Sequence, residues 1–307
     1  MIDILKKFNY TFVALISLFL VACNKDGDIT IDNPDEPQSP SQPGVSMNYS
    51  VLEYLPAPGQ YINEEASGSG KINSASEACS YAEKRLSDGL YVSLGAWGGY
   101  IVVKFDKSIH NSGDYDFSIG CNAFDSSNEP GIVWVMKDEN NNGIPDETWY
   151  ELKGSYYEKP GYEKDYQVTY FRPSNPREDI RWIDSNGDEG VITWMGNYHS
   201  QDFYYPAWVK TDSYTLSGTR LPLMAERNEL TGIWTNLPFE WGYVDNKGND
   251  FNPKNNQNFF KISNAIDSDG KSVSLESVDF IKVQTAVNGQ SGWLGENSTE
   301  VCGFFIE

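Results

Sequence analysis

The fold is decided by the stretch Gly98-Gly99-Tyr100-Ile101-Val102-Val103-Lys104-Phe105-Asp106. It is dominated by β-branched and aromatic residues without helical spacing, which is typical of a strand. Similar short segments recur between Asn, Asp, Gly and Pro residues, and about a dozen strands with few helices favour an antiparallel sandwich. We expect strands over 91–94, 100–106, 116–121, 131–136, 148–152, 166–172, 180–183, 190–194, 214–216, 259–262, 278–285 and 301–306.

One short helix is expected near the start of this all-β body. Ser74-Ala75-Ser76-Glu77 fits a capping box, in which Ser74 is the N-cap and Glu77 reaches back to the chain before the helix. Asp88-Gly89 ends the helix, because glycine readily takes the left-handed conformation that follows a helix. The buried face at helical spacing consists of Ala78, Tyr81, Ala82 and Leu86.

The first residues read as a targeting signal. An apolar run from Phe12 to Ala22 follows Lys6 and Lys7, and it is too short to cross roughly 30 Å of hydrocarbon as a helix. The run ends in Leu20-Val21-Ala22-Cys23, which resembles a lipobox. We therefore expect a signal peptide over 1–22 and a lipid anchor on Cys23; the alternative is an ordinary signal peptide.

The segment after Cys23 predicts a tether and a location. Asn24-Lys25-Asp26-Gly27-Asp28 resembles the export signal of Bacteroidota surface lipoproteins, although Gly27 interrupts the acidic pair. Residues 23–46 are rich in proline and acids and nearly free of apolar side chains, so we expect a flexible spacer. The expected body is 47–307, one large domain with an aromatic-rich insertion at about 195–258. The expected location is the outer membrane, facing the cell exterior.

Charge and cysteine content narrow the possible partners. The net charge of −21 argues against nucleic acid and anionic lipid surfaces and is compatible with divalent cations. Beyond Cys23 the chain has Cys79, Cys121 and Cys302, and three cysteines cannot all pair with one another. Either one bridge forms, such as Cys121 to Cys302, or all three are free thiols.

A candidate calcium site lies between two expected strands. The run from Asp138 to Asp146 places oxygen ligands at positions 1, 3, 5, 7 and 9 of an EF-hand-type loop, with glycine at position 6. Position 12 is Trp149 instead of glutamate, and the flanks read as strands, so we expect a hairpin loop that binds structural Ca²⁺. The alternative is a plain Asn/Gly turn. The expected ligands are Asp138, Asn140, Asn142, Ile144 and Asp146.

Two aromatic stretches are candidates for a ligand surface. They cover 194–208 and 234–243, and their rings are interrupted by polar residues without a period of two. Aromatic rings offer a flat apolar face, and Tyr and Trp add a polar group, which suits ligand binding. The alternative is that many of these rings belong to the core. The expected binding residues are Trp208, Trp234 and Trp241, with Tyr204, Tyr205 and Phe239.

Several segments carry a family resemblance. They are Val92-Ser93-Leu94-Gly95, Gly98 to Asp106, Asp114 to Phe117, Asn122-Ala123-Phe124, Ile262 to Asp267, Val278 to Thr285 and Gly292 to Glu296. Together they resemble a family of Bacteroidota cell-surface lipoproteins with a galactose-binding-like sandwich. The resemblance covers about 68–307 and implies a jelly-roll-like arrangement at the cell surface, but it implies no reaction.

The leading functional hypothesis is a non-enzymatic binding lipoprotein. It would capture a small molecule or glycan and pass it to a TonB-dependent outer-membrane transporter. Similar proteins are sometimes encoded near corrinoid uptake systems, so the resemblance favours a cobamide (vitamin B12-type) ligand. Signals for an enzyme are few, since the chain has only His110 and His199 and no Gly-x-Ser-x-Gly motif. The alternatives are a glycan-active hydrolase and a calcium-stabilised structural or adhesive protein.

Overall fold

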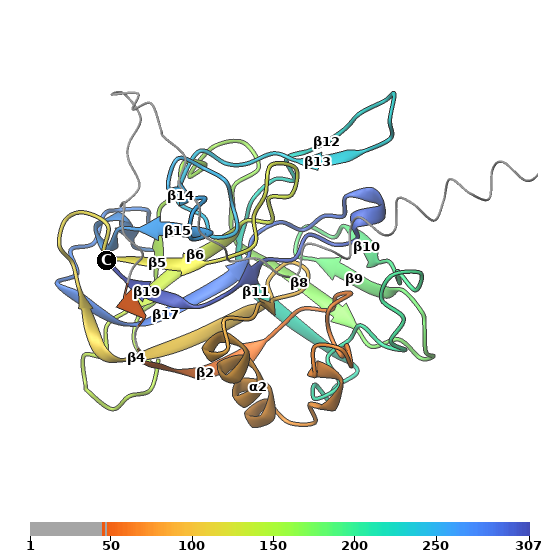
Figure 1. Cartoon of the computed structure of the whole chain (residues 1–307), viewed down its shortest axis with the longest axis horizontal. Helices are drawn as coiled ribbons and strands as arrows, with labels where there is room; N and C mark the ends of the chain where they lie inside the picture. Colours follow the sequence, from red (N-terminus) through yellow and green to blue (C-terminus); the bar gives the residue numbers. More distant parts are fainter. Residues whose placement is uncertain (1–44, 47) are drawn as a thin grey trace, which may run out of the picture. The chain divides into compact units, whose positions relative to one another are not determined.

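The structure, a computed structural model, describes residues 45–46 and 48–307, all within the compact unit Pro37–Glu307. The predicted antiparallel all-β sandwich is confirmed, because the named strands in this part of the chain pair only in antiparallel fashion. Its largest sheet has six strands (Figure 1). Their order is β16 (Ala265–Ile266), β7 (Tyr150–Leu152), β6 (Gly131–Met136), β17 (Ser277–Thr285), β4 (Tyr100–His110) and β2 (Tyr49–Leu55).

A five-stranded sheet forms the second layer of the sandwich. Its order is β1 (Val45–Ser46), β19 (Phe304–Ile306), β5 (Phe117–Gly120), β15 (Gln257–Phe260) and β14 (Phe251–Asn252). Side chains from both sheets meet in the main hydrophobic core, among them Val103 of β4, Ile119 of β5 and Val133 of β6. This shared core fixes the two layers against each other.

The six-stranded sheet is also covered on its outer face. Along β6, Val133 and Val135 enter the main core, while Ile132 points the other way into a cluster with Phe239 and Tyr243. Successive side chains of a strand point to opposite faces. Burial on both faces therefore explains why this segment is an uninterrupted apolar run instead of an alternating one.

A separate four-stranded sheet supports the region of greatest interest below. Its order is β10 (Glu189–Ile192), β9 (Ile180–Asp184), β8 (Glu163–Phe171) and β11 (Ser213–Arg220). One face packs on a second core cluster in which the Trp97 and Tyr166 rings meet edge to face at 4.7 Å. The hydroxyl of Tyr170 donates to the Trp97 carbonyl at 2.7 Å, so its polar end is satisfied although the ring is buried.

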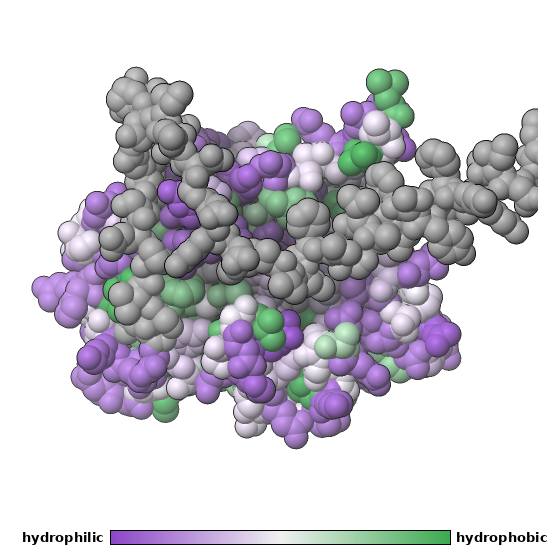
Figure 2. All heavy atoms as spheres, viewed as in Figure 1, coloured by the Kyte–Doolittle hydropathy of each residue, from purple (hydrophilic) through white to green (hydrophobic). Residues whose placement is uncertain are grey.

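Two short strand pairs complete the described sheets. One joins β3 (Val92–Ser93) to β18 (Glu300–Val301), and the other is the hairpin of β12 (Ala225–Arg227) and β13 (Trp234–Asn236). The hairpin projects from the body (Figure 1), and its connecting residues include Leu230 and Ile233, both exposed. Figure 2 shows apolar surface at this tip, whereas most of the visible face is hydrophilic.

The predicted helix is confirmed as α2 (Ala75–Ser87). Ser74 Oγ accepts the Glu77 amide at 3.2 Å, and the Glu77 carboxylate accepts the Asn73 amide at 2.7 Å, one residue before the N-cap. The helix buries Ala78, Ala82 and Leu86 against the main core beside β2, and it ends before Gly89, whose φ is 69°. Three short 3₁₀ turns accompany it: η1 (Ser69–Lys71), η2 (Ile262–Asn264) and η3 (Gly292–Leu294).

Four details differ from the expectations. The edge strand β2 was not anticipated, and the expected strand over 301–306 is divided into β18 and β19 by Gly303, whose φ of 108° breaks the extended backbone. The last two residues assigned to the tether, Val45 and Ser46, form β1 and pair with β19. The expected insertion over 195–258 is not a separate unit, because its β11 completes the four-stranded sheet and its β14 and β15 belong to the five-stranded sheet.

The three cysteines of the described body are free thiols. Cys121 is buried beside Asn258, and the Cys302 thiol contacts the Gly89 carbonyl at 3.3 Å. Of the two alternatives left open by the sequence, the structure has three unpaired cysteines. No helix in the described residues has both the length and the apolar character needed to span a membrane.

Candidate functional site

A cavity of about 900 Å³ lies where three segments distant in sequence come together. They are residues 63–70 after β2, residues 172–174 at the end of β8, and residues 198–207 in the loop between β10 and β11. Two aromatic side chains on its wall remain accessible, Tyr198 at 66% exposure and Phe203 at 40%. We call this site the His199 cavity, after the histidine on its wall.

Amide side chains hold the loops of the cavity together. Asn63, whose backbone is left-handed with φ 61°, donates from Nδ2 to the carbonyls of Phe203 at 2.9 Å and Tyr205 at 2.7 Å. Its Oδ1 accepts the Ala207 amide at 3.1 Å. Gln201 donates in the other direction, to the carbonyls of Gln60 and Ile62. These bonds fix the wall without any ligand.

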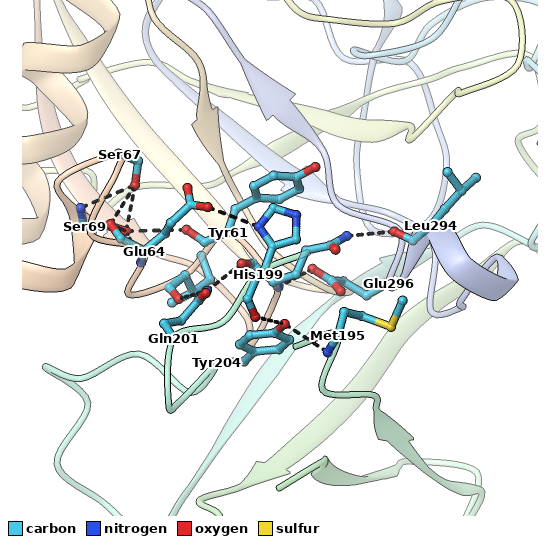
Figure 3. Close-up of polar contacts among 12 residues, drawn as sticks. Tyr61, Glu64, Ser67, Ser69, Met195, His199, Gln201, Tyr204, Leu294 and Glu296 are labelled. Carbon is cyan, nitrogen blue, oxygen red and sulfur yellow. Dashed lines mark hydrogen bonds and ion pairs between the residues drawn. The ribbon is translucent and has the colours of Figure 1, made fainter. Parts of the chain in front are cut away.

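A histidine–glutamate pair forms one side of the cavity (Figure 3). Nδ1 of His199 lies 3.1 Å from Oε1 of Glu64, and the Tyr61 ring meets the imidazole edge to face at 4.6 Å. The Ser69 hydroxyl accepts the Glu64 amide at 2.8 Å, and the Tyr204 hydroxyl donates to the His199 carbonyl at 2.8 Å. The backbone of both members of the pair is therefore held in place by a side-chain hydrogen bond.

A cation belongs to the segment 172–174 of the wall. The Arg172 guanidinium stacks 4.5 Å above the Tyr205 ring and donates to the carbonyls of Val209 and Thr211. Stacking on an aromatic face suits the planar guanidinium and holds it in one orientation. The wall thus presents a fixed positive group together with the carboxylates of Glu64 and Glu65.

The expected aromatic binding residues are placed differently from the prediction. Trp208, Tyr204 and Phe239 are buried and do not line the cavity, because their rings pack into the hydrophobic core; Trp208 lies 6.1 Å from the Tyr54 ring. Tyr205 does line the cavity, although its ring is largely covered. The first stretch nevertheless supplies the wall through Tyr198, His199 and Phe203, which are not among the expected binding residues.

The second aromatic stretch lies elsewhere. No residue of 234–243 lines the His199 cavity. Trp234 is half-buried on β13 against Gly292, and the half-buried Trp241 donates its backbone amide to the Ser155 hydroxyl. The two stretches therefore do not share this cavity. Alternation in sequence could not separate them, since both consist of irregular loops and short strands.

The predicted calcium loop connects β6 to β7, which pair antiparallel, so the hairpin is as expected. Its side-chain oxygens turn inward and accept backbone amides: both Asp138 and Asn140 accept Asn142 N–H, and Asn142 accepts Ile144 N–H at 2.7 Å. The Asp146 carboxylate accepts from the Asn142 side chain at 3.1 Å. Oxygens from four of the five expected side chains and carbonyls thus gather within one turn; binding of calcium there stays a prediction.

A second acidic group was not anticipated. Carboxylate oxygens of Glu129, Asp245 and Glu300 all lie within 4.8 Å of one another, the one such arrangement of His, Cys, Asp or Glu in the described residues. Burial raises the pKa of Glu300 to about 7 and raises the pKa values of Glu129 and Asp245 well above their usual range. Three such groups either share protons or hold a cation. They are far apart in sequence, and Asp245 reads as part of an ordinary turn.

Comparison with known proteins gives no further assignment. Neither the protein-family models nor the curated proteins compared with this chain produce a match. The predicted lipidation residue, Cys23, lies outside the described residues. The case for a function therefore rests on the sequence and on the cavity.

Proposed function

We propose that this protein is a surface lipoprotein that captures a nutrient molecule in the His199 cavity. The observation that carries the proposal is the cavity wall, where the exposed rings of Tyr198 and Phe203 stand beside a fixed cation and a histidine. Binding sites for small molecules typically combine apolar faces with a few well-placed polar groups. The hydrogen bonds of Asn63 and Gln201 favour affinity, because a preformed wall loses little entropy on binding.

A cobamide is the ligand that we favour, and a glycan is the other class. The family resemblance supports the cobamide, and a cavity of about 900 Å³ accommodates a large part of such a molecule. Flat rings suit either a macrocycle or a sugar face. Arg172 and the amide groups of the wall suit the peripheral amides and phosphate of a cobamide as well as sugar hydroxyls.

The proposed cellular role combines this site with the expected anchor. A lipid on Cys23 would hold the protein at the outer membrane, and the segment that follows would let the body move near a TonB-dependent transporter. We also propose that calcium binds the Asp138 loop as a structural ion. The catalytic alternative, a glycan-active hydrolase, has no specific observation in its favour beyond the carboxylates on the wall.

The binding test is a titration of the purified protein with a panel of cobamides and glycans, followed by single variants. Tyr198→Ala and Phe203→Ala should each weaken binding by roughly thirtyfold, about 2 kcal/mol, because truncation of an aromatic anchor typically costs that much. Their melting temperatures should hardly change, since both rings are exposed. Trp208→Ala should instead lower the unfolding free energy by about 3–5 kcal/mol, as large core truncations do.

Phe124→Ala is the matched control, because its ring is 56% exposed and does not line the cavity. It should leave both affinity and melting unchanged. Equal affinity of the Tyr198, Phe203 and Phe124 variants would place the ligand elsewhere. Release of reducing sugar from a glycan in the panel would favour the hydrolase over simple capture.

A further inference from the structure

The imidazole of His199 has one nitrogen engaged and one available. Nδ1 faces the Glu64 carboxylate, and Figure 3 shows the other ring nitrogen on the opposite side of the ring. Within the described part of the chain, Nε2 makes no hydrogen bond, and the residue lines the cavity. A proton on Nδ1 satisfies the carboxylate, which leaves the lone pair of the ring on Nε2.

This is the arrangement that proteins use to prepare a histidine for a metal. A carboxylate that accepts from one imidazole nitrogen fixes the tautomer and the ring orientation and raises the basicity of the other nitrogen. The side chains of His199 and Glu64 are only 16% and 26% exposed, and the Tyr61 ring restricts rotation of the imidazole. The pair is therefore held in place more firmly than a surface ion pair.

A free metal ion does not suit this position. Protein sites for zinc and similar ions use three or four side-chain ligands. In the described residues, three His, Cys, Asp or Glu side chains converge only at Glu129, Asp245 and Glu300, and none of these lines the cavity. A single nitrogen is sufficient when the metal arrives with its other positions already filled by an organic chelate.

We propose that His199 Nε2 binds the metal centre of the captured ligand, a planar metal macrocycle with one exchangeable axial position. The metal–nitrogen bond forms as a metal-bound water leaves, and the oxidation state of the metal does not change. The exposed rings of Tyr198 and Phe203 give the macrocycle flat faces to lie against, and Arg172 meets its acidic or polar periphery. This inference rests on the proposed function and specifies which form of the ligand is held most tightly.

The test uses two cobamides that differ at the upper axial position. Aquocobalamin carries an exchangeable water there, whereas the methyl group of methylcobalamin blocks the position. The wild-type protein should bind aquocobalamin at least tenfold more tightly and should shift its visible absorption spectrum, because imidazole replaces water on cobalt. His199→Asn should remove both the shift and the preference. Asparagine keeps a donor near Glu64 but lacks a nitrogen at the Nε2 position.

The other histidine of the chain supplies the control. His110 is exposed at the end of β4, and His110→Asn should retain the spectral shift and the preference. Equal affinity for the two cobamides with an unshifted spectrum in the wild type would overturn this inference while leaving cobamide capture in place. A shift that persists in His199→Asn would overturn it as well. Binding of neither cobamide would overturn the proposed cobamide ligand together with the inference.

Discussion

Glu296 is a carboxyl group with little around it to stabilise a negative charge. Its side chain is 2% exposed, Oε1 accepts the Gln60 amide at 2.7 Å, and Oε2 has no partner in the described structure. Burial, with a smaller contribution from Glu300, raises the pKa of Glu296 to about 8. Burial likewise raises the pKa of Asp250 to about 7. At neutral pH these groups hold protons that the unfolded chain would release.

This predicts a protein that loses stability as the pH rises. A carboxyl whose folded pKa is raised contributes stability that is complete below its ordinary pKa of 4.5 and is lost as the pH rises through about 8. In the presence of chelator, the free energy of unfolding should fall by on the order of a few kcal/mol between pH 5.5 and pH 8.5. Denaturant titrations at the two pH values measure the difference.

Glu296→Gln should reduce this dependence on pH, because the amide keeps an oxygen for the Gln60 amide and cannot ionise. Glu229→Gln is the control, since the Glu229 side chain is 84% exposed. A pH dependence that is identical in all three proteins would show that Glu296 is not the group responsible.

Single aromatic residues illustrate what the sequence can and cannot predict at this scale. Residues 194–208 were expected to contribute to a ligand surface, and Tyr198, His199 and Phe203 do line the cavity. Which ring faces solvent could not be predicted, because Tyr204 and Trp208 carry the same chemistry and are buried by partners distant in sequence. Local spacing carries information on burial only where the backbone is regular.

At the scale of elements, the hairpin loop from Asp138 to Asp146 is the element whose form the sequence predicts most specifically. Its hairpin geometry was predicted from the flanking strand patterns, and the side-chain oxygens of Asp138, Asn140 and Asn142 accept backbone amides within the loop. The loop is tied to the body, because the Asp138 amide donates to Asp279 at 2.8 Å and Asp279 pairs with Lys137. A metal in this loop would therefore stabilise the whole sandwich.

Calcium should raise the melting temperature, and chelator should lower it. An ion that binds only the native state adds about 2.7 kcal/mol when its concentration is a hundred times its Kd. Asp138→Ala should abolish the difference between the two conditions. Scanning calorimetry with calcium and with chelator measures it.

Glu300→Gln is the informative comparison, because Glu300 belongs to the group of three converging carboxylates in the described residues. If this variant loses the calcium response and Asp138→Ala keeps it, the calcium site is the group of Glu300 with Glu129 and Asp245. If calcium does not change the melting temperature of the wild-type protein, the Asp138 loop is a plain turn without a metal site.

Elements with strong local signals were predicted well, and those that depend on tertiary pairing were not. The capping box set the start of α2, and β6 was expected over the residues that it occupies. The strand β2 was missed although Val51 and Tyr54 are buried, because its register against β4 shifts between Val51 and Glu53. A bulge disturbs the alternation on which strand prediction depends.

At the scale of the whole molecule, the sandwich was predictable and the cavity was not. Strand number and composition indicate an antiparallel sandwich, since few other arrangements bury so many short apolar segments. The His199 cavity brings together residues near 64, 172 and 199, and the bonds of Asn63 that join them link residues about 140 positions apart. No local pattern contains such a contact.

The proposed anchor predicts where the whole protein is found. Cys23→Ala should leave the protein without lipid and release it from the membrane fraction, because a lipid chain at this position is the proposed attachment. Labelling with radioactive fatty acid, together with fractionation, measures both effects, and Cys79→Ala is the control. Label that still enters the Cys23 variant would contradict the prediction, and protection of the wild type from protease on intact cells would place it on the inner side.

The short pairing of β1 with β19 has a mechanical consequence. Within residues 45–46 and 48–307, β1 pairs with β19 through two residues, Val45 opposite Ile306 and Ser46 opposite Phe305. A pulling force that arrives through residue 45 acts on these two pairs before it reaches β2. Their separation lengthens the connection by roughly 7 Å, the reach of two extended residues, and leaves β2 and the segment 63–70 in place. A protein attached through this end would yield slightly under load while the wall of its cavity keeps its shape.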